Sequence, residues 1–216
     1  MKIKPIISFE GISGSGKTYF INKLKTDEQF LDTVFIKELS ERDNNSFENK
    51  IINILKSKSN LFFSKGNPYT ETLLLLAIKT YDYENLKNNK GLKYKFIFED
   101  RSIDTIAIYQ SILLNKDRNK RLQTSIDLLN FASLFRPVPT YSFLLIDDFQ
   151  ICIKRAENRN NKIFNSNEID ILQSAYNLYL EYVEYFKNRF IILDRRIFDE
   201  NEIITKILNF KCSTLI

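Results

Sequence analysis

The sequence predicts an α/β fold in which a doubly wound, parallel sheet of about five strands is flanked by helices. Five short runs are nearly continuous in Ile, Phe, Leu and Val, which is typical of strands covered by helices on both faces. These runs span residues 6–10, 34–37, 96–99, 142–146 and 190–193. Segments with helical spacing of apolar residues separate them, and this alternation indicates parallel strands joined by helical crossovers. Ligands of such sheets bind where loops leave the carboxyl ends of the strands.

Each expected strand is followed by one or two expected helices. In chain order, the helices lie at 17–25 after the first strand, at 47–56 and 69–88 after the second, at 103–115 and 123–134 after the third, at 149–158 and 168–187 after the fourth, and at 199–210 after the fifth. Pro68 suits the first turn of a helix, where its missing amide hydrogen is not needed. The 216 residues contain no internal repeat and no Pro/Gly/Ser-rich linker. We therefore expect a single domain over 1–216.

The composition excludes several classes of enzyme. The chain has no histidine, which removes Ser-His-Asp and Cys-His catalysis and most zinc enzymes. Its two cysteines cannot form a disulfide framework, and they lack the paired spacing of a zinc site. Any chemistry must therefore use carboxylates, lysine, arginine, backbone amides or a metal held by carboxylates.

Charge and hydropathy limit the partners and the location. The net charge is +5 and the pI is about 9.0, but the basic residues are spread along the chain, so anionic ligands are permitted and nucleic acid is not an expected partner. The apolar stretches at 73–78 and 143–146 are far shorter than the roughly 20 residues of a membrane span. The apolar run after Lys4 is interrupted at Glu10, unlike a signal peptide. We expect a cytoplasmic protein without a membrane partner.

One motif carries the chemistry. Residues 11–18, Gly-Ile-Ser-Gly-Ser-Gly-Lys-Thr, form a complete G-x-x-x-x-G-K-[ST] phosphate-binding loop between the first strand and the first helix. Glycines let several amide N–H groups converge on phosphate oxygens at the positive end of a helix. Lys17 is expected to reach the β- and γ-phosphates of ATP, and Thr18 to ligate Mg²⁺. An ordinary glycine-rich turn is the alternative interpretation.

A second group of candidates follows the third strand. Asp100 could hold Mg²⁺ through water, and Arg101 could clamp an anionic substrate, because both follow the apolar run at 96–99. Alternatively, Asp100 simply caps the helix that begins near Ile103.

Basic residues near the fourth expected strand suggest a lid over 154–167. They are Lys154, Arg155, Arg159 and Lys162. Mobile basic segments close over phosphates, exclude water and stabilise charge during transfer. A solvated helix face is the alternative. The consecutive apolar residues at 73–76 predict burial in the core or, as a second possibility, packing in a homodimer.

In these motifs and their order, the chain resembles thymidylate kinase-type nucleoside monophosphate kinases, which have the P-loop kinase fold. The matching segments are 9–18, Lys37-Glu38, Thr70-Glu71, Asp100-Arg101, Tyr109-Gln110, Arg136-Pro137 and Lys154-Arg155-Ala156 with Arg159. The resemblance implies transfer of the γ-phosphoryl group of ATP to a nucleotide 5′-phosphate, with Mg²⁺, in a homodimer. It also implies a transition-state arginine, and because residues 11–18 contain none, Arg155, Arg159 or Lys162 must serve.

The resemblance assigns further roles by position. Glu38 and Arg101 border the phosphate and sugar of the acceptor, and Tyr109 and Gln110 line its base pocket. Leu75 stands where the family has the Phe that stacks on thymine, and Lys79 where it has Arg. The resulting candidates are catalytic Lys17, Asp100, Arg101, Arg155 and Arg159; donor-binding Gly11, Ser13, Gly14, Ser15, Gly16, Lys17, Thr18 and Arg155; acceptor-binding Glu10, Glu38, Leu75, Lys79, Arg101, Tyr109 and Gln110; and metal-binding Thr18 and Asp100.

Three functions remain open from the sequence. The first is ATP- and Mg²⁺-dependent phosphorylation of a nucleoside monophosphate, most simply dTMP. The second is a deoxynucleoside kinase, which the chain also resembles: Glu10 would be the base for a 5′-hydroxyl, and Asp100-Arg101-Ser102 matches an acid-Arg-Ser triplet. The third is a nucleotide-binding module without turnover.

Overall fold

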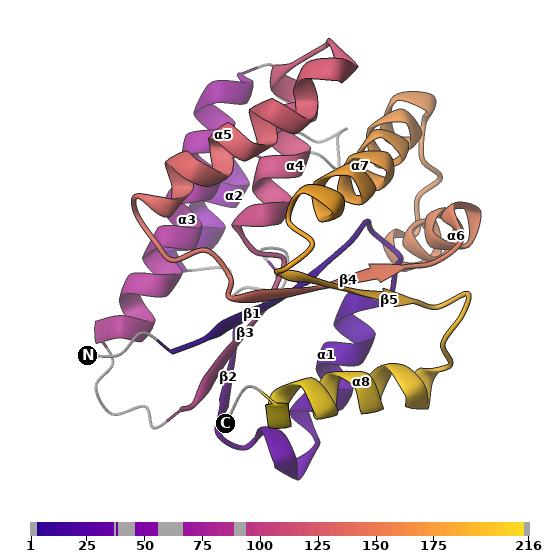
Figure 1. The fold of residues 1–216 in the computed structure, drawn as a ribbon. Coiled ribbons are helices and arrows are strands. Elements are labelled where there is room, and N and C mark those ends of the chain that lie inside the picture. The colour runs from indigo at the N-terminus through magenta and orange to yellow at the C-terminus, as the bar shows by residue number, and fades with distance from the viewer. Residues whose placement is uncertain (1–3, 37, 39–45, 56–66, 89–93, 214–216) are drawn as a thin grey trace.

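The computed structural model describes residues 4–36, 38, 46–55, 67–88 and 94–213 (Figure 1). Its five strands are β1 (Ile6–Glu10), β2 (Thr33–Ile36), β3 (Phe96–Asp100), β4 (Tyr141–Ile146) and β5 (Phe190–Asp194). All are parallel, in the order β2-β3-β1-β4-β5. Each strand lies within one residue of its expected bounds, because strands buried on both faces leave an unbroken apolar signal.

The helices flank the sheet as expected. They are α1 (Lys17–Lys25), α2 (Phe47–Leu55), α3 (Pro68–Asn88), α4 (Ile103–Leu114), α5 (Arg121–Ser133), α6 (Phe149–Asn160), α7 (Ser166–Tyr185) and α8 (Glu200–Ser213). Pro68 is the first residue of α3. The start of α7 is earlier than expected because Asn165 and Glu168 form a reciprocal capping box.

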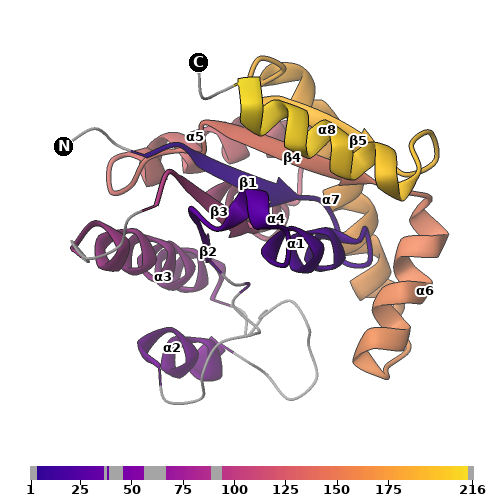
Figure 2. The same ribbon diagram turned by 90° about the horizontal axis from the view of Figure 1, so that it is seen from below.

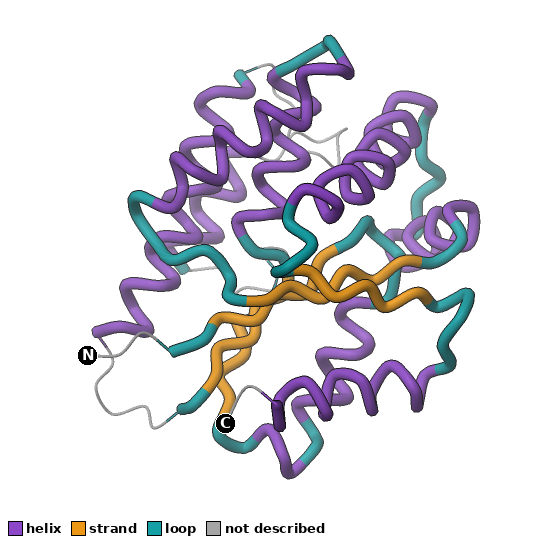
Figure 3. The backbone as a smooth tube through the Cα atoms, in the orientation of Figure 1, coloured by secondary structure: helices purple, strands orange, loops and turns teal. Residues whose placement is uncertain are grey.

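Two layers of helices enclose the sheet. Helices α1 and α8 cover one face, and α3, α4, α5 and α7 cover the other (Figures 1 and 3). The view from below shows α1 and α8 in front of the strands and α6 beyond the end of the sheet (Figure 2). Helix α4 packs against α3, α5 and α7, and it is apolar on most sides because it lies at the centre of its layer.

The sheet separates two apolar clusters. The cluster under α1 and α8 includes Phe9, Phe20 and Phe143, and the larger one under α4 and α7 includes Ile106 and Tyr182. Of the apolar run at 73–76, Leu75 and Leu76 are buried, whereas Leu73 is 56% exposed. The expected burial is therefore confirmed for only part of that run. None of the described helices is both long and apolar enough to cross a lipid bilayer.

Candidate active site at the phosphate loop

The loop between β1 and α1 has the conformation that phosphate binding requires. Gly11, Gly14 and Gly16 have φ values of 129°, 83° and 103°, which side chains other than glycine rarely adopt. Space is a second constraint, because a Cβ atom on Gly14 would overlap the carbonyl group of Cys152 in α6. The loop leads directly into the N-terminus of α1 at Lys17, where the helix dipole favours anions.

Lys17 lies inside this loop. Its Nζ donates hydrogen bonds to the carbonyl oxygens of Gly11 at 3.0 Å and Ile12 at 2.8 Å, and the residue is 4% exposed. Burial, followed by the positive charge of Arg101, lowers the pKa of Lys17 to about 7 against the opposing effect of Asp100. The Lys17 side chain is thus hydrogen-bonded to carbonyl groups of the loop itself, and a bound triphosphate would compete with these carbonyl groups for it.

This arrangement predicts proton uptake on nucleotide binding. Free Lys17, with a pKa of about 7, is mostly neutral at pH 8, and the phosphates of ATP favour its charged form. We expect the uptake of close to one proton per MgATP at pH 8 and almost none at pH 6, where Lys17 is already charged. Calorimetry in buffers of different ionisation enthalpy measures this uptake. Equal uptake at both pH values would contradict the assignment.

Asp100 and Thr18 form the metal-binding candidate. Asp100 ends β3, and its Oδ2 accepts a hydrogen bond from Thr18 Oγ1 at 3.0 Å. Its Oδ1 is buried and has no hydrogen-bond partner among the described residues. Burial raises the pKa of Asp100, and Lys17 is the main opposing influence. The alternative role as helix cap is wrong, because the side chain of Ser102 caps α4 by accepting from the amide of Asp104.

Arg101 contacts the first residues of the loop. Its Nε donates to Glu38 Oε1 at 2.8 Å, Nη1 to the Gly11 carbonyl oxygen at 3.1 Å, and Nη2 to Ser13 Oγ at 3.3 Å. Its guanidinium carbon is 5.9 Å from the centre of the Tyr109 ring. Burial opposes ionisation of Glu38, but Arg101 and then Lys17 outweigh it and lower the Glu38 pKa. The structure thus brings Arg101, Glu38 and Tyr109 together beside the loop.

Three polar side chains on α3 and α4, those of Glu71, Thr72 and Gln110, bind one another. Gln110 Oε1 accepts from Thr72 Oγ1 at 2.9 Å, and Gln110 Nε2 donates to Glu71 Oε1 at 3.2 Å. Burial raises the pKa of Glu71 to about 7. Leu75 lies on α3 and is 5% exposed. Glu71 belongs to a segment that matches the family but was given no role in the sequence analysis, and Thr72 was not among the candidates, although both lie near the start of the helix that begins at Pro68.

A sequence model of the thymidylate kinase family matches residues 9–201. This chain belongs to that family. Thymidylate kinase from Mycoplasma mobile is 28% identical over 215 residues, which cover 94% of this chain and 95% of the relative. Thymidylate kinase from Wolbachia sp. subsp. Brugia malayi is 32% identical over 164 residues, which cover 71% and 70%. A crystal structure of thymidylate kinase from Ehrlichia chaffeensis shares the fold, with a TM-score of 0.61, 17% identity, and coverage of 95% and 97%.

Family membership confirms the expected fold class and the expectation of a nucleotide kinase. The family resemblance implies a transition-state arginine, so the question is which basic residue of the lid has a side chain that is not already paired. Arg155 Nη1 is 2.5 Å from Asp147 Oδ2, and Lys162 Nζ is 2.6 Å from Glu168 Oε1. Both cations therefore already have carboxylate partners.

Arg159 is placed differently from the other lid cations. It is exposed, and its side chain forms no ion pair or hydrogen bond with the described part of the chain. The pKa of Lys17 is lowered mainly by burial, and the positive charge of Arg159 lowers it further by a smaller amount. Arg159 is therefore near enough to act on the loop electrostatically, which makes it the candidate for the transition-state role among the lid residues.

Two acceptor-binding candidates lie in the interior instead. Glu10 is 0% exposed, and its carboxylate accepts hydrogen bonds from Ser102 N at 3.0 Å, Ser102 Oγ at 2.6 Å and Thr105 Oγ1 at 2.5 Å. Lys79 is 1% exposed, and its Nζ is bound to Glu99 Oε1 at 3.1 Å and to the Arg101 carbonyl oxygen. Protein groups bind both side chains, so neither is open to an acceptor in this arrangement, and their acceptor-binding role stays a prediction.

Two residues near the loop were missed in the sequence. Arg195 follows β5 and donates from Nη1 to the Ser15 carbonyl oxygen at 3.3 Å, and Asp147 follows β4 and pairs with both Arg155 and Arg195. Each comes directly after a buried strand, at the sheet edge where ligands bind, and this position is a usable signal. Together they connect α6 to the loop.

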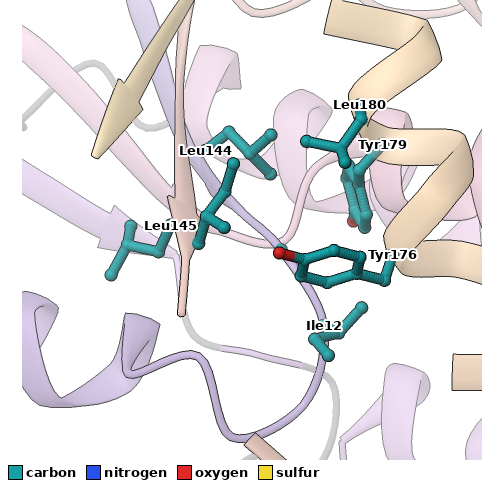
Figure 4. Close-up of a pocket in the computed structure, with 8 residues that line it drawn as sticks. Ile12, Leu144, Leu145, Tyr176, Tyr179 and Leu180 are labelled. Atoms are coloured by element: carbon teal, nitrogen blue, oxygen red, sulfur yellow. The ribbon is translucent and has the colours of Figure 1, made fainter. Parts of the chain in front are cut away.

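A small pocket lies on the inner side of the loop. Its lining is almost entirely apolar and comes from Gly11, Ile12, Leu144, Leu145, Ile146, Tyr176, Tyr179 and Leu180 (Figure 4). Because apart from the two tyrosine hydroxyl groups its side chains are apolar, it has no charged group for a phosphate, and it is a contact between the loop, β4 and α7.

Proposed function

We propose that this chain transfers the γ-phosphoryl group of ATP to the 5′-phosphate of dTMP and yields dTDP and ADP. The observation that carries the proposal is the placement of Arg101 beside the phosphate loop, where it can clamp an anionic acceptor. The matching relatives are thymidylate kinases by name, which supports dTMP as the acceptor. Phosphoryl transfer needs little covalent chemistry, so positioning and charge stabilisation account for catalysis.

The donor side would use residues 11–18. Loop amides and Lys17 would bind the β- and γ-phosphates, and Arg159 would stabilise the charge that develops on the transferred group. Thr18 and Asp100 fit Mg²⁺, because Asp100 presents a buried oxygen without a hydrogen-bond partner beside the Thr18 hydroxyl group. When bound there, Mg²⁺ supplies positive charge that offsets that of the phosphate oxygens.

The acceptor side would use residues from β3, α3 and α4. Arg101, held by Glu38, would bind the acceptor phosphate, and Tyr109 would flank the nucleotide beside it. Gln110 would present its amide group to the base, in an orientation set by Thr72 and Glu71. The lid over 154–167 would close the site on the donor side.

A deoxynucleoside kinase is less well supported. Its chemistry requires a carboxylate base within reach of a 5′-hydroxyl group. Glu10, the candidate base, is enclosed by Ser102, Thr105 and Tyr179. Glu38 remains more accessible, but Arg101 and Lys17 overcome the effect of burial and lower its pKa, which makes it a weak base. A monophosphate acceptor is already an anion and needs no such base.

A coupled assay of ADP release tests the function. We expect turnover with dTMP, weaker turnover with dUMP and other monophosphates, and none with free thymidine, because only the monophosphates carry the group that Arg101 binds. Turnover of a nucleoside without turnover of any monophosphate would identify the alternative kinase. ATP binding by calorimetry without turnover of any acceptor would identify a binding module.

We also propose that the enzyme is a cytoplasmic homodimer. Exposed apolar side chains on neighbouring helices support the dimer: Ile54 on α2 is 63% exposed, and Tyr69 and Leu73 on α3 are 74% and 56% exposed. Covering such a surface with a second copy removes apolar area from water. Sedimentation should give the mass of a dimer, and Leu73→Glu should give the mass of a monomer. A wild-type monomer at assay concentration would contradict this proposal.

A further inference from the structure

A buried cluster of three charged side chains contacts the backbone of Arg101. Lys79 from α3, Glu99 from β3 and Arg136 from the segment before β4 have side chains that are at most 1% exposed. Arg136 Nη1 and Nη2 donate to Glu99 Oε1 and Oε2 at 3.0 Å and 2.9 Å, which is a bidentate pair. Lys79 Nζ donates to Glu99 Oε1 at 3.1 Å. Burial opposes ionisation of Glu99, but Arg136 and then Lys79 outweigh it and lower its pKa to about 2.

The cluster has two cations for one carboxylate. Because Arg136 already satisfies both oxygens of Glu99, Lys79 is not needed to balance the charge, and an extra buried ammonium group is unfavourable unless other groups bind it. The second partner of Lys79 is the carbonyl oxygen of Arg101. This contact is what distinguishes Lys79 from Arg136 within the cluster.

The peptide group after Arg101 is held from both sides. Lys79 binds its carbonyl oxygen, and Glu10 Oε1 accepts from its amide group, that of Ser102, at 3.0 Å. Arg101 has φ 59°, in the left-handed region, and besides Asn161 it is the one such non-glycine residue in the described part of the chain. That conformation is unfavourable for a side chain and persists where the surroundings stabilise it.

The conformation of Arg101 decides where its guanidinium group lies. With φ 59°, the side chain leaves the end of β3 toward the loop and reaches Glu38, the Gly11 carbonyl group and Ser13. The geometry points to Lys79 as a positioning residue: fixed by Glu99, its ammonium group holds the Arg101 carbonyl group and so aims the Arg101 guanidinium group at the reacting phosphates. This inference rests on the proposed function in that Arg101 is taken to bind the acceptor.

Lys79→Met and Arg136→Met form a matched pair of variants. Each removes one cation and leaves Glu99 paired with the other, and each also frees a backbone carbonyl oxygen: that of Arg101 in Lys79→Met and that of Lys79 in Arg136→Met. Only Lys79→Met frees the Arg101 carbonyl group. We expect Lys79→Met to lower kcat by about 10- to 100-fold, as small displacements of catalytic groups do, and to leave ATP affinity by calorimetry unchanged. Arg136→Met should lower kcat much less. Equal losses of kcat in the two variants would overturn the inference.

A double-mutant cycle with Arg101→Gln separates positioning from general damage. If Lys79 acts through Arg101, Lys79→Met should have almost no further effect on kcat once Arg101 is Gln, because the two losses are not additive. The same fold-loss in both backgrounds would overturn the inference. Lys79→Leu, which also removes both the charge and the hydrogen-bond donor, serves in place of Lys79→Met if the latter does not fold.

A crystal structure of the Lys79→Met protein tests the inference independently of the acceptor. We expect Arg101 to relax to a negative φ and its guanidinium group to leave Glu38. An unchanged φ near 59° with the Glu38 contact intact would overturn the role of Lys79. This result is independent of the proposed function. If the wild-type protein does not phosphorylate dTMP, the proposed function fails, but the crystal structure still shows whether the conformation of Arg101 depends on Lys79.

Discussion

Replacing Lys17 with methionine is expected to lower kcat by about 10³-fold, comparable to the loss of a donor that stabilises transition-state charge. Methionine keeps the length of the side chain and removes the ammonium group that would follow the γ-phosphate. The ammonium group now bonds to the carbonyl oxygens of Gly11 and Ile12, so the loop loses those bonds as well. The coupled ADP-release assay at saturating ATP and acceptor measures kcat, and calorimetry measures the loss of ATP affinity.

Lys25→Met is the control for this prediction. Lys25 also lies on α1, is exposed, and bonds only to the side chain of Asn22 and the ring of Phe35 among the described residues. Its replacement should leave kcat and ATP affinity unchanged. A Lys17→Met protein with wild-type ATP affinity and turnover would disprove the assignment of residues 11–18 as the donor site.

Replacing Asp100 with asparagine is expected to lower kcat by about 10²- to 10³-fold and to raise the Mg²⁺ concentration needed for half-maximal rate. Asparagine has the same shape but no charge, so it would hold a hydrated cation poorly. Burial raises the pKa of Asp100, which means that the ionised carboxylate is unfavourable at this position. The variant should therefore melt at the same temperature as the wild type or higher, while it loses activity.

A Mg²⁺ titration of the rate, together with thermal unfolding, checks the Asp100 prediction. Asp127→Asn is the control, because Asp127 is exposed on α5 and accepts a hydrogen bond from Gln123 alone among the described residues. It should behave as the wild type in both measurements. If Asp100→Asn kept the wild-type dependence on Mg²⁺, the metal site would have to be sought elsewhere.

The sequence predicted two kinds of feature well: contiguous motifs, and strands that helices cover on both faces. Residues 11–18 form one contiguous loop, so the spacing of glycines alone determines where the amides converge. The strands are covered on both faces and appear as unbroken apolar runs, whereas helix ends depend on single caps such as Asn165 and shift by a few residues. Asp100 and Arg101 followed from the same reasoning, because Asp100 ends a strand that pairs with β1 and Arg101 comes directly after it.

The burial of Glu10 and Lys79 could not be predicted in the same way. Both are charged residues that the resemblance placed at the acceptor, and nothing within a few residues of either indicates a buried partner. The partners come from far along the chain: Ser102 and Thr105 for Glu10, Glu99 for Lys79. The contact of Arg195 with Ser15 is also non-local, since it joins residues 180 positions apart, although the position of Arg195 directly after β5 was a usable signal.

The amino-acid order by itself determined that this protein has a parallel sheet with a phosphate loop at its centre, because both depend on residues that are neighbours in sequence. Only the tertiary structure decided which charged side chains remain open to a substrate. A buried charge must find a partner or be neutralised, and whether it does so depends on which distant segments the fold brings beside it. For Glu10 and Lys79 those segments close the side chain off from solvent, and for Arg159 they leave it exposed near the loop.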